Sequence, residues 1–320
     1  MKKFTSLLLA VLLIMTLSMG AFAMDSYVIE EGDTLYGISA RVGVSMDKLV
    51  ELNGIENPNL IYSGDLLKLV PDYSSMDLNE QLVMATLWFQ KSAEMRAISY
   101  QTFNFAKVLV DMDLADETIT ADSRAIVVDL DETILDNSDY EAWLIGKDFG
   151  YSSSTWNPWI QAGISPALPG AVEFLNYVAD QEVQVYYISN RKVLDDNSGY
   201  IGTKANLMAL GLPFADEEHL LLRTGSSNKT ERRTYVEDQH HVILYMGDNL
   251  NDFLADFAGI GVDERLAVTD MYKAEFGKKF IVIPNPMYGE WEGSVYNFNW
   301  GFSAEEKSNA RKDILRTWNH

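Results

Sequence analysis

The sequence predicts an α/β protein with a doubly wound parallel sheet and a smaller helical cap, preceded by a small βααβ module. Three observations support this prediction. Apolar runs that suit strands buried on both faces end abruptly in polar residues, at Ala125–Val128, Val183–Ile188, His219–Leu222 and Val242–Met246. Helical segments lie between them, such as Ala171 to Ala179 and Thr203 to Leu210. The first 70 residues follow a different, shorter pattern.

Composition limits the function before any motif is considered. The chain has 320 residues, 47% of them hydrophobic, and a formal net charge of −22. This content of apolar residues excludes a disordered chain, and the acidic surface makes a nucleic-acid duplex an unfavourable partner. The absence of cysteine from the sequence excludes disulfides, thiolate–zinc sites, cysteine nucleophiles and lipid attachment through cysteine.

Residues 1–23 have the pattern of a secretory signal peptide. Lys2 and Lys3 precede an apolar stretch from Leu7 to Leu17, and Ala21-Phe22-Ala23 supplies an A-x-A cleavage site. The apolar stretch is short for a membrane span, which needs about 20 residues. We therefore expect export to the cell exterior or cell wall without membrane contact after cleavage, and an uncleaved anchor is the alternative.

Residues 25–70 read as strand, helix, helix, strand. Tyr27-Val28-Ile29 forms the first predicted strand, and Leu66 to Leu69 forms the second. Apolar residues at helical spacing predict the two helices between them, at Leu35, Ile38 and Val42 and at Met46, Leu49 and Leu52. This segment resembles the LysM domain along nearly its full length, in "YVIEEGDTLYGIS", "VSMDKLVELNGI" and "NPNLIYSGDLLKL".

The LysM resemblance implies binding of glycans that contain N-acetylglucosamine, such as peptidoglycan or chitin. The groove would lie between the loop of Gly32, Asp33 and Thr34 and the loop from Pro58 to Ile61, which carries Asn59, Leu60 and Ile61. The alternative is a small domain that only protects the N-terminus.

A polar linker at residues 71–76 separates this module from the remaining domain, residues 77–320. Asp77, with Glu80 three residues later, predicts the capped start of a long helix. The packing face of that helix is expected to carry Leu82, Thr86, Phe89, Ala93, Ala97, Tyr100 and Phe103.

Four carboxylates are expected to meet beyond the carboxyl ends of the strands, those of Asp129, Asp131, Asp248 and Asp252. Like charges so close need a cation or protonation, and oxygen ligands without thiolate or histidine favour Mg²⁺. With Lys229 and Ser189 nearby, such a pocket suits a phosphoryl group. The sequence has no cysteine and no P-loop motif, so a carboxylate is the expected nucleophile.

The same segments resemble the class C acid phosphatases of the haloacid dehalogenase (HAD) superfamily. The signatures are "IVVDLDETILDNSDY" (126–140) and "VILYMGDNLNDF" (242–253). The resemblance implies that Asp129 attacks the phosphate and that Asp131 acts as acid and then base. It also implies that Ser189 and Lys229 hold the phosphate oxygens. Asp129, the Asp131 carbonyl and Asp248 would bind Mg²⁺, with Asp252 acting through water or through Lys229. Because Asp131 must carry its proton, we expect an acidic optimum.

Nucleoside 5′-monophosphates and similar aromatic monophosphates are the substrates that the resemblance favours, and a homodimer is also implied. Trp156 and Tyr288 are candidates for stacking on a base, and Asn190 is a further candidate substrate contact. Trp159 and Trp291 have two alternative roles, substrate contact and core packing, and the sequence favours neither. Two alternatives stay open, namely a wall-binding protein with an inactive phosphatase domain and a sugar-phosphate phosphatase of the same superfamily.

Overall fold

The computed structural model describes residues 25–318, so the predicted signal peptide lies outside the described residues. The chain forms two compact units, with the boundary between Asp72 and Tyr73.

The N-terminal unit is a βααβ module. Strands β1 (Ser26–Val28) and β2 (Leu66–Lys68) pair antiparallel, and helices α2 (Leu35–Val42) and α3 (Met46–Asn53) lie between them in sequence. Both helices begin at a hydroxyl cap and end at a glycine with positive φ, as short exposed helices commonly do. Their apolar faces meet in one small core, formed by Ile29, Leu35, Ile38, Leu49, Leu67 and Leu69.

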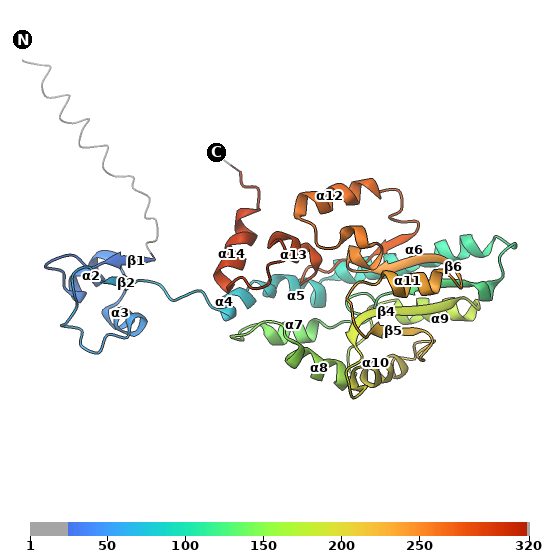
Figure 1. The fold of residues 1–320 in the computed structure, drawn as a ribbon, viewed down its shortest axis with the longest axis horizontal. Helices are drawn as coiled ribbons and strands as arrows, with labels where there is room; N and C mark the ends of the chain where they lie inside the picture. Colours follow the sequence, from blue (N-terminus) through green and yellow to red (C-terminus); the bar gives the residue numbers. More distant parts are fainter. Residues whose placement is uncertain (1–24, 319–320) are drawn as a thin grey trace, which may run out of the picture. The chain divides into compact units, whose positions relative to one another are not determined.

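A five-stranded parallel sheet is the centre of the second unit (Figure 1). Its strands are β3 (Arg124–Val128), β4 (Gln184–Lys192), β5 (Leu220–Arg223), β6 (His241–Gly247) and β7 (Phe280–Val282), in the spatial order β5-β4-β3-β6-β7. All five residues of β3 are buried, as the uninterrupted apolar run predicts for a strand covered on both faces. The predicted fold class is confirmed.

Alternate residues of β3 belong to two different cores, one on each face of the sheet. Ile126 and Val128 join the larger cluster, together with residues of α6 (Ala93–Leu114) and α9 (Ala171–Asp180). Ala125 and Val127 join the smaller cluster, which includes Val236 of α11 (Thr230–Glu237). This alternation follows from the two-residue period of an extended chain.

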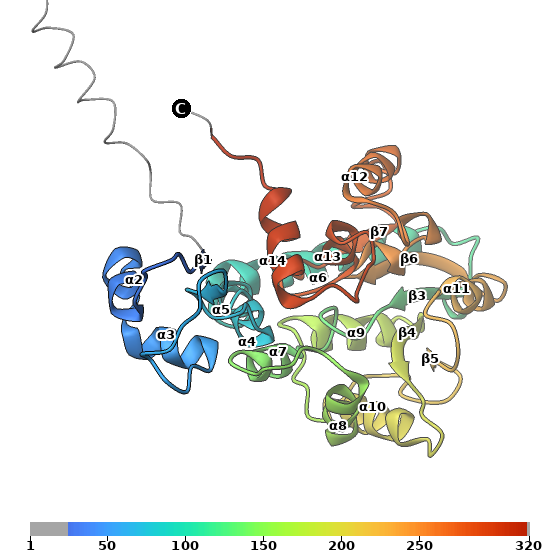
Figure 2. The same ribbon diagram turned by 60° about the vertical axis from the view of Figure 1, so that its left-hand side comes forward.

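The remaining helices surround these layers (Figures 1 and 2). Between β3 and β4 lie α7 (Ser138–Leu144) and α8 (Ser153–Ala162), which pack against α5 (Leu82–Lys91) and α10 (Ser198–Ala209) respectively. Helices α12 (Val262–Met271), α13 (Glu290–Val295) and α14 (Ala304–Asp313) follow β6 and β7. In residues 25–318, no helix combines the length and the apolar character that crossing a membrane requires.

The predicted helix beginning at Asp77 is wrong in its start and its continuity. Ser74 is the cap of a short helix α4 (Ser75–Asn79), and Asp77 is the residue that completes the capping box. A second break at Ser92, which adopts an extended conformation, separates α5 from α6. The break shifts the helical phase, so Ala93, Ala97 and Tyr100 are exposed. The packing face of α6 instead carries Met95, Ser99, Thr102, Phe103, Ala106 and Val110.

Candidate functional site

The site lies where the chain order of the sheet reverses. Strand β3 is flanked by β4 on one side and β6 on the other, so successive connections leave in opposite directions and open a crevice at the strand ends. Asp129 is the first residue after β3, and its backbone N–H donates to the Met246 carbonyl at 2.9 Å. Asp248 is the first residue after β6. The two carboxylates therefore project from neighbouring strand ends.

A cluster of three carboxylates occupies this crevice. Ligand oxygens of Asp129, Asp248 and Asp252 lie within 4.8 Å of one another. Lys229, at the start of α11, is buried and places its Nζ 2.5 Å from Asp129 Oδ1 and 2.6 Å from Asp252 Oδ1. Of the two roles left open for Asp252, the structure shows the pairing with Lys229.

The charges in this cluster do not balance. One ammonium faces three carboxylates, and burial raises the pKa of Asp129 to about 7 although the Lys229 charge opposes the rise. Burial, followed by the charges of Asp252 and Asp129, raises the pKa of Asp248 well above its ordinary value. Burial opposes the charge on Lys229, but the two carboxylates outweigh it and raise the pKa of Lys229. A divalent cation would supply the missing positive charge, and the all-oxygen donor set fits Mg²⁺.

One side-chain amide and one backbone N–H orient the carboxylates of the cluster. Asn285, which follows β7, donates its side-chain N–H to Asp248 Oδ2 at 2.9 Å. The backbone N–H of Asn249 donates to Asp252 Oδ2 at 3.0 Å. Each contact leaves the other oxygen of its carboxylate for a metal or for Lys229.

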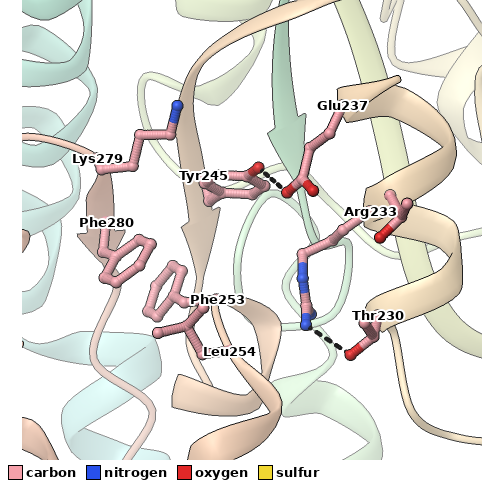
Figure 3. A pocket seen from close by; sticks show the side chains of 9 residues that line it. Thr230, Arg233, Glu237, Tyr245, Phe253, Leu254, Lys279 and Phe280 are labelled. Atoms are coloured by element: carbon pink, nitrogen blue, oxygen red, sulfur yellow. Dashed lines mark hydrogen bonds between the residues drawn. The ribbon is translucent and has the colours of Figure 1, made fainter. Parts of the chain in front are cut away.

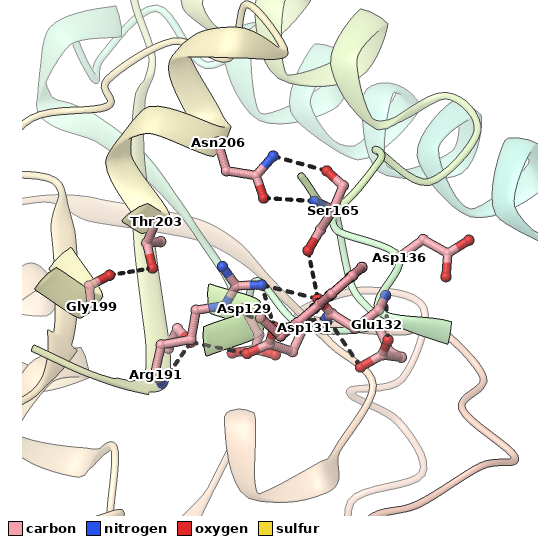
Figure 4. A network of polar contacts seen from close by, with 12 residues as sticks. Asp129, Asp131, Glu132, Asp136, Ser165, Arg191, Gly199, Thr203 and Asn206 are labelled. Carbon is pink, nitrogen blue, oxygen red and sulfur yellow. Dashed lines mark hydrogen bonds and ion pairs between the residues drawn. The ribbon is translucent and has the colours of Figure 1, made fainter. Parts of the chain in front are cut away.

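Asp131 belongs to a second polar network (Figure 4). Arg191 Nε and Nη2 lie 2.9 and 2.8 Å from Asp131 Oδ1, and Asn137 Nδ2 donates to the same oxygen at 2.8 Å. Ser189 Oγ is 3.4 Å from the other oxygen. Arg191 is buried, and its remaining nitrogen, Nη1, has no hydrogen-bond partner in the described part of the chain.

Asn137 is the centre of that network. Its Oδ1 accepts from Arg191 Nη2 at 3.1 Å, from Trp159 Nε1 at 2.8 Å and from Ser165 Oγ at 2.8 Å. Ser165 is held in turn by two backbone hydrogen bonds with the Asn206 side chain (Figure 4). The Trp159 indole is therefore engaged within the protein, which favours the packing interpretation for this residue.

Glu132 adopts a left-handed conformation, with φ of 53°, and is fully buried. Its carboxyl group accepts from the Asn137 backbone N–H at 2.8 Å and from the hydroxyl of Tyr288. Burial, followed by the charges of Asp131 and Asp248, raises the pKa of Glu132 well above its ordinary value. Tyr288 thus connects the segment after β7 to the turn that carries Asp131.

The other residues that were expected to contact substrate differ in their exposure and in their contacts. Ser189 is fully buried in β4, and the neighbouring Asn190 is exposed. Trp156 of α8 is half-buried, with its ring 4.9 Å from that of Tyr140 and 6.0 Å from the Arg191 guanidinium. Trp291 is 45% exposed and donates its indole N–H to the Tyr288 carbonyl.

Two cavities lie in the second unit. The smaller, of about 170 Å³, reaches Lys229 and Asp252 and is lined mainly by amide and hydroxyl side chains. The larger, of about 280 Å³, lies between α11 and strands β6 and β7 and is lined by Tyr245, Phe253 and Phe280 among others (Figure 3). Several of its polar groups are already paired, since Tyr245 donates to Glu237 and Arg233 donates to Thr230. Only the smaller cavity adjoins the carboxylate cluster.

In the N-terminal unit, the expected glycan-binding residues divide into two kinds. The Asp33 carboxylate is engaged by Tyr27 and Arg41, and Thr34 caps α2, so both support the module itself. Gly32, Asn59 and Leu60 are exposed, and Ile61 packs against the small core.

Sequence reasoning assigned no role to Arg191, Asn137 or Asn285. Arg191 follows Ser189 and Asn190 in the polar end of β4, and Asn285 lies between two prolines after β7. Arg191 lies in the polar end of its strand and Asn285 lies beyond the end of β7, and polar residues at strand ends are the signal that identified the other candidates.

Comparison with known proteins identifies the family. The sequence model of the HAD superfamily, subfamily IIIB (acid phosphatase) matches residues 71–291, and that of the LysM domain matches residues 27–70. The chain belongs to the subfamily IIIB acid phosphatases, is a phosphomonoesterase and carries a LysM domain.

Two solved structures are similar to this chain. The class C acid phosphatase from Bacillus anthracis is 41% identical with a TM-score of 0.71, and covers 76% of this chain and 99% of its own. The same enzyme with tungstate bound is 40% identical with a TM-score of 0.70 and equal coverage. A curated relative, the uncharacterized lipoprotein YgeR of Escherichia coli (strain K12), is 44% identical over 50 residues, or 16% of this chain. The chain therefore spans only a fifth of that relative's length.

Proposed function

We propose that this chain is an exported, Mg²⁺-dependent acid phosphatase that hydrolyses nucleoside 5′-monophosphates or similar aromatic monophosphates at the cell wall. The observation that carries the proposal is the buried cluster of Asp129, Asp248 and Asp252 around Lys229, with Asp131 two residues from Asp129.

The proposed metal ligands are Asp129, Asp248 and the backbone carbonyl of Asp131. When bound, Mg²⁺ would offset the negative charge of the carboxylates and of the phosphate oxygens that approach them. Asn285 fixes one oxygen of Asp248 and leaves the other for the metal.

Asp129 is the proposed nucleophile. One of its carboxylate oxygens attacks phosphorus, the P–O bond to the alcohol breaks, and Asp131 gives its proton to the departing oxygen. Asp131 then takes a proton from water, the resulting hydroxide attacks phosphorus, and the Asp129 carboxylate is released with inorganic phosphate. Arg191 and Asn137 hold Asp131 in place through both steps.

Lys229 and Ser189 are proposed to bind the phosphate oxygens. Lys229 already contacts Asp129, so a phosphate that approaches this carboxylate meets the ammonium as well. The tungstate in the related Bacillus anthracis structure supports oxyanion binding, because tungstate is a tetrahedral oxyanion as phosphate is.

Aromatic residues support the proposed choice of substrate. Trp156 lies half-buried beside Arg191, and Tyr288 lies half-buried beside Glu132. Either ring could present a face to a base. Trp156 and Tyr288 are therefore the residues that we propose to favour nucleotides over simple sugar phosphates.

The LysM domain is the proposed wall tether. It suggests binding to peptidoglycan or a chitin-type glycan. The curated relative is a lipoprotein, but this chain has no cysteine to carry a lipid. The exposed Gly32, Asn59 and Leu60 are the proposed glycan contacts. We would expect the full chain to sediment with insoluble peptidoglycan, and no sedimentation would exclude the tether.

Hydrolysis of a panel of phosphomonoesters, with Mg²⁺ and with a chelator, tests the enzymatic proposal. Asp129→Asn should lower kcat at least about a thousandfold, because it removes the nucleophile. Asp180→Asn, at the exposed end of α9, is the matched control. Activity that survives in Asp129→Asn would contradict the mechanism, and a preference for simple sugar phosphates would contradict the substrate class.

A further inference from the structure

The smaller cavity has a chemistry different from that of the carboxylate cluster beside it. Its walls include Lys229 and Asp252, and also four asparagines, two serines and one glutamate: Asn190, Asn228, Asn249, Asn251, Ser226, Ser227 and Glu290. The lining contains no aromatic side chain, so the cavity does not suit a base. Neutral hydrogen-bonding groups predominate.

Two arginines fix the orientation of three of these asparagine side chains, Asn190, Asn249 and Asn251. Arg265 of α12, which is buried, donates to Asn251 Oδ1 at 3.1 Å and to Asn249 Oδ1 at 3.0 Å. Arg232 of α11 donates to Asn190 Oδ1 at 2.7 Å. A guanidinium group can only donate, so each asparagine must turn its oxygen toward the arginine and its NH₂ group away from it.

The three NH₂ groups are therefore available as donors. None of them forms a hydrogen bond with another residue between positions 25 and 318, and none is buried without a partner. All three asparagines are at least partly exposed, so water can accept from these NH₂ groups in the free enzyme, and a ligand with acceptor atoms can take its place.

Glu290 supplies the complementary group. Glu290 lines the same cavity and forms no hydrogen bond or ion pair within the described residues, and its charge acts on the nearby Arg265. A carboxylate accepts from hydroxyl groups and repels a second phosphate. Amide donors and a carboxylate acceptor together at one wall are the arrangement that recognises a group that both donates and accepts, which is a hydroxyl.

We infer that this cavity is a subsite for the sugar hydroxyls of the phosphate ester. The NH₂ groups of Asn190, Asn249 and Asn251 donate to the hydroxyl oxygens, and Glu290 accepts from the hydroxyl hydrogens. Lys229 lines the cavity and also contacts Asp129, so a group in the cavity is attached close to the transferred phosphate. The inference rests on the proposed function. It adds that the enzyme recognises the sugar hydroxyls of the substrate through hydrogen bonds.

A matched pair of substrates isolates these hydroxyls. Uridine 5′-monophosphate and 2′,3′-dideoxyuridine 5′-monophosphate share base and phosphate and differ only in two hydroxyl groups. For the full chain with Mg²⁺, we expect kcat/KM to be at least about tenfold higher for the ribonucleotide, since one hydrogen bond to a charged group contributes about that much. Equal values of kcat/KM for the two nucleotides would overturn the inference.

Two variants assign the preference to the cavity. Glu290→Gln keeps the side-chain shape and removes the charge, and Asn251→Asp keeps the oxygen that faces Arg265 while it replaces the NH₂ donor. Each should lower the ratio of the two kcat/KM values toward one. The added charge of Asn251→Asp acts equally on both nucleotides and cancels in the ratio. Thermal unfolding of each variant verifies its fold.

The possible results separate the inference from the proposed function. If the wild-type chain hydrolyses neither nucleotide, the proposed function fails. If it hydrolyses both and the preference for the ribonucleotide persists in both variants, the hydroxyls are recognised elsewhere and the inference fails alone.

Discussion

Replacing Glu141 with glutamine should remove a large part of the pH dependence of stability of the phosphatase unit. Glu141 lies in α7, is 6% exposed, and no described residue donates a side-chain hydrogen bond to its carboxyl group. Burial, followed by the charge of Glu292, raises the pKa of Glu141 from its ordinary value of 4.5 to about 7. The folded chain therefore keeps this proton at pH values where the unfolded chain has lost it.

The sign and the size follow from that difference. Stability that Glu141 contributes is fully present below pH 4.5 and is lost as the pH rises through about 7. The interval spans about 2.5 pH units, and at about 1.4 kcal/mol per unit the wild-type chain loses up to about 3 kcal/mol of unfolding free energy. For a unit of this size the loss corresponds to a fall in Tm of about 6–12 °C.

Thermal unfolding of the full chain between pH 4 and pH 8, with a chelator present throughout, measures this effect. Glu141→Gln cannot ionise, so its Tm should fall less than that of the wild type across this range. Glu173→Gln, exposed on α9, is the control and should follow the wild type. Parallel curves for the wild type and Glu141→Gln would refute the reasoning.

Three further predictions concern the carboxylate cluster and Asp131. Saturating Mg²⁺, at about 100 times its dissociation constant, should add about 2.7 kcal/mol and raise Tm by about 5–10 °C. The rise should be larger at pH 8 than at pH 5, because the raised pKa values of Asp129 and Asp248 let protons compete with the metal. No dependence on pH in thermal-shift measurements would contradict this competition. Asn285→Ala should weaken Mg²⁺ binding about 10- to 100-fold by titration calorimetry, since it frees the Asp248 side chain, and unchanged affinity would exclude the positioning role. Arg191→Lys should lower kcat about 10- to 100-fold with little change in KM, because lysine cannot hold Asp131 through two nitrogens, and a change in KM alone would argue against it.

The sheet could be predicted from sequence because its signal is local. Each strand is a continuous run of apolar residues followed at once by polar ones, and a strand that is buried on both faces needs little else to be recognised. The same reasoning failed between Leu78 and Phe103, where the apolar spacing suggested one helix. The extended backbone of Ser92 interrupts the helix there and changes which residues of α6 face the core. The spacing of apolar residues does not reveal such a break.

The sequence by itself determined the family, the βααβ module, the parallel sheet and the carboxylates at the strand ends, because each depends on residues close together in the chain. Only the tertiary structure decided how those carboxylates are held. Arg191 and Asp131 are 60 residues apart, Asn285 and Asp248 are 37 apart, and Tyr288 and Glu132 are 156 apart. Which buried donor meets which acceptor depends on how the strands and helices pack. Buried polar groups need partners, and these partners lie far apart in the sequence, where no local pattern reveals them.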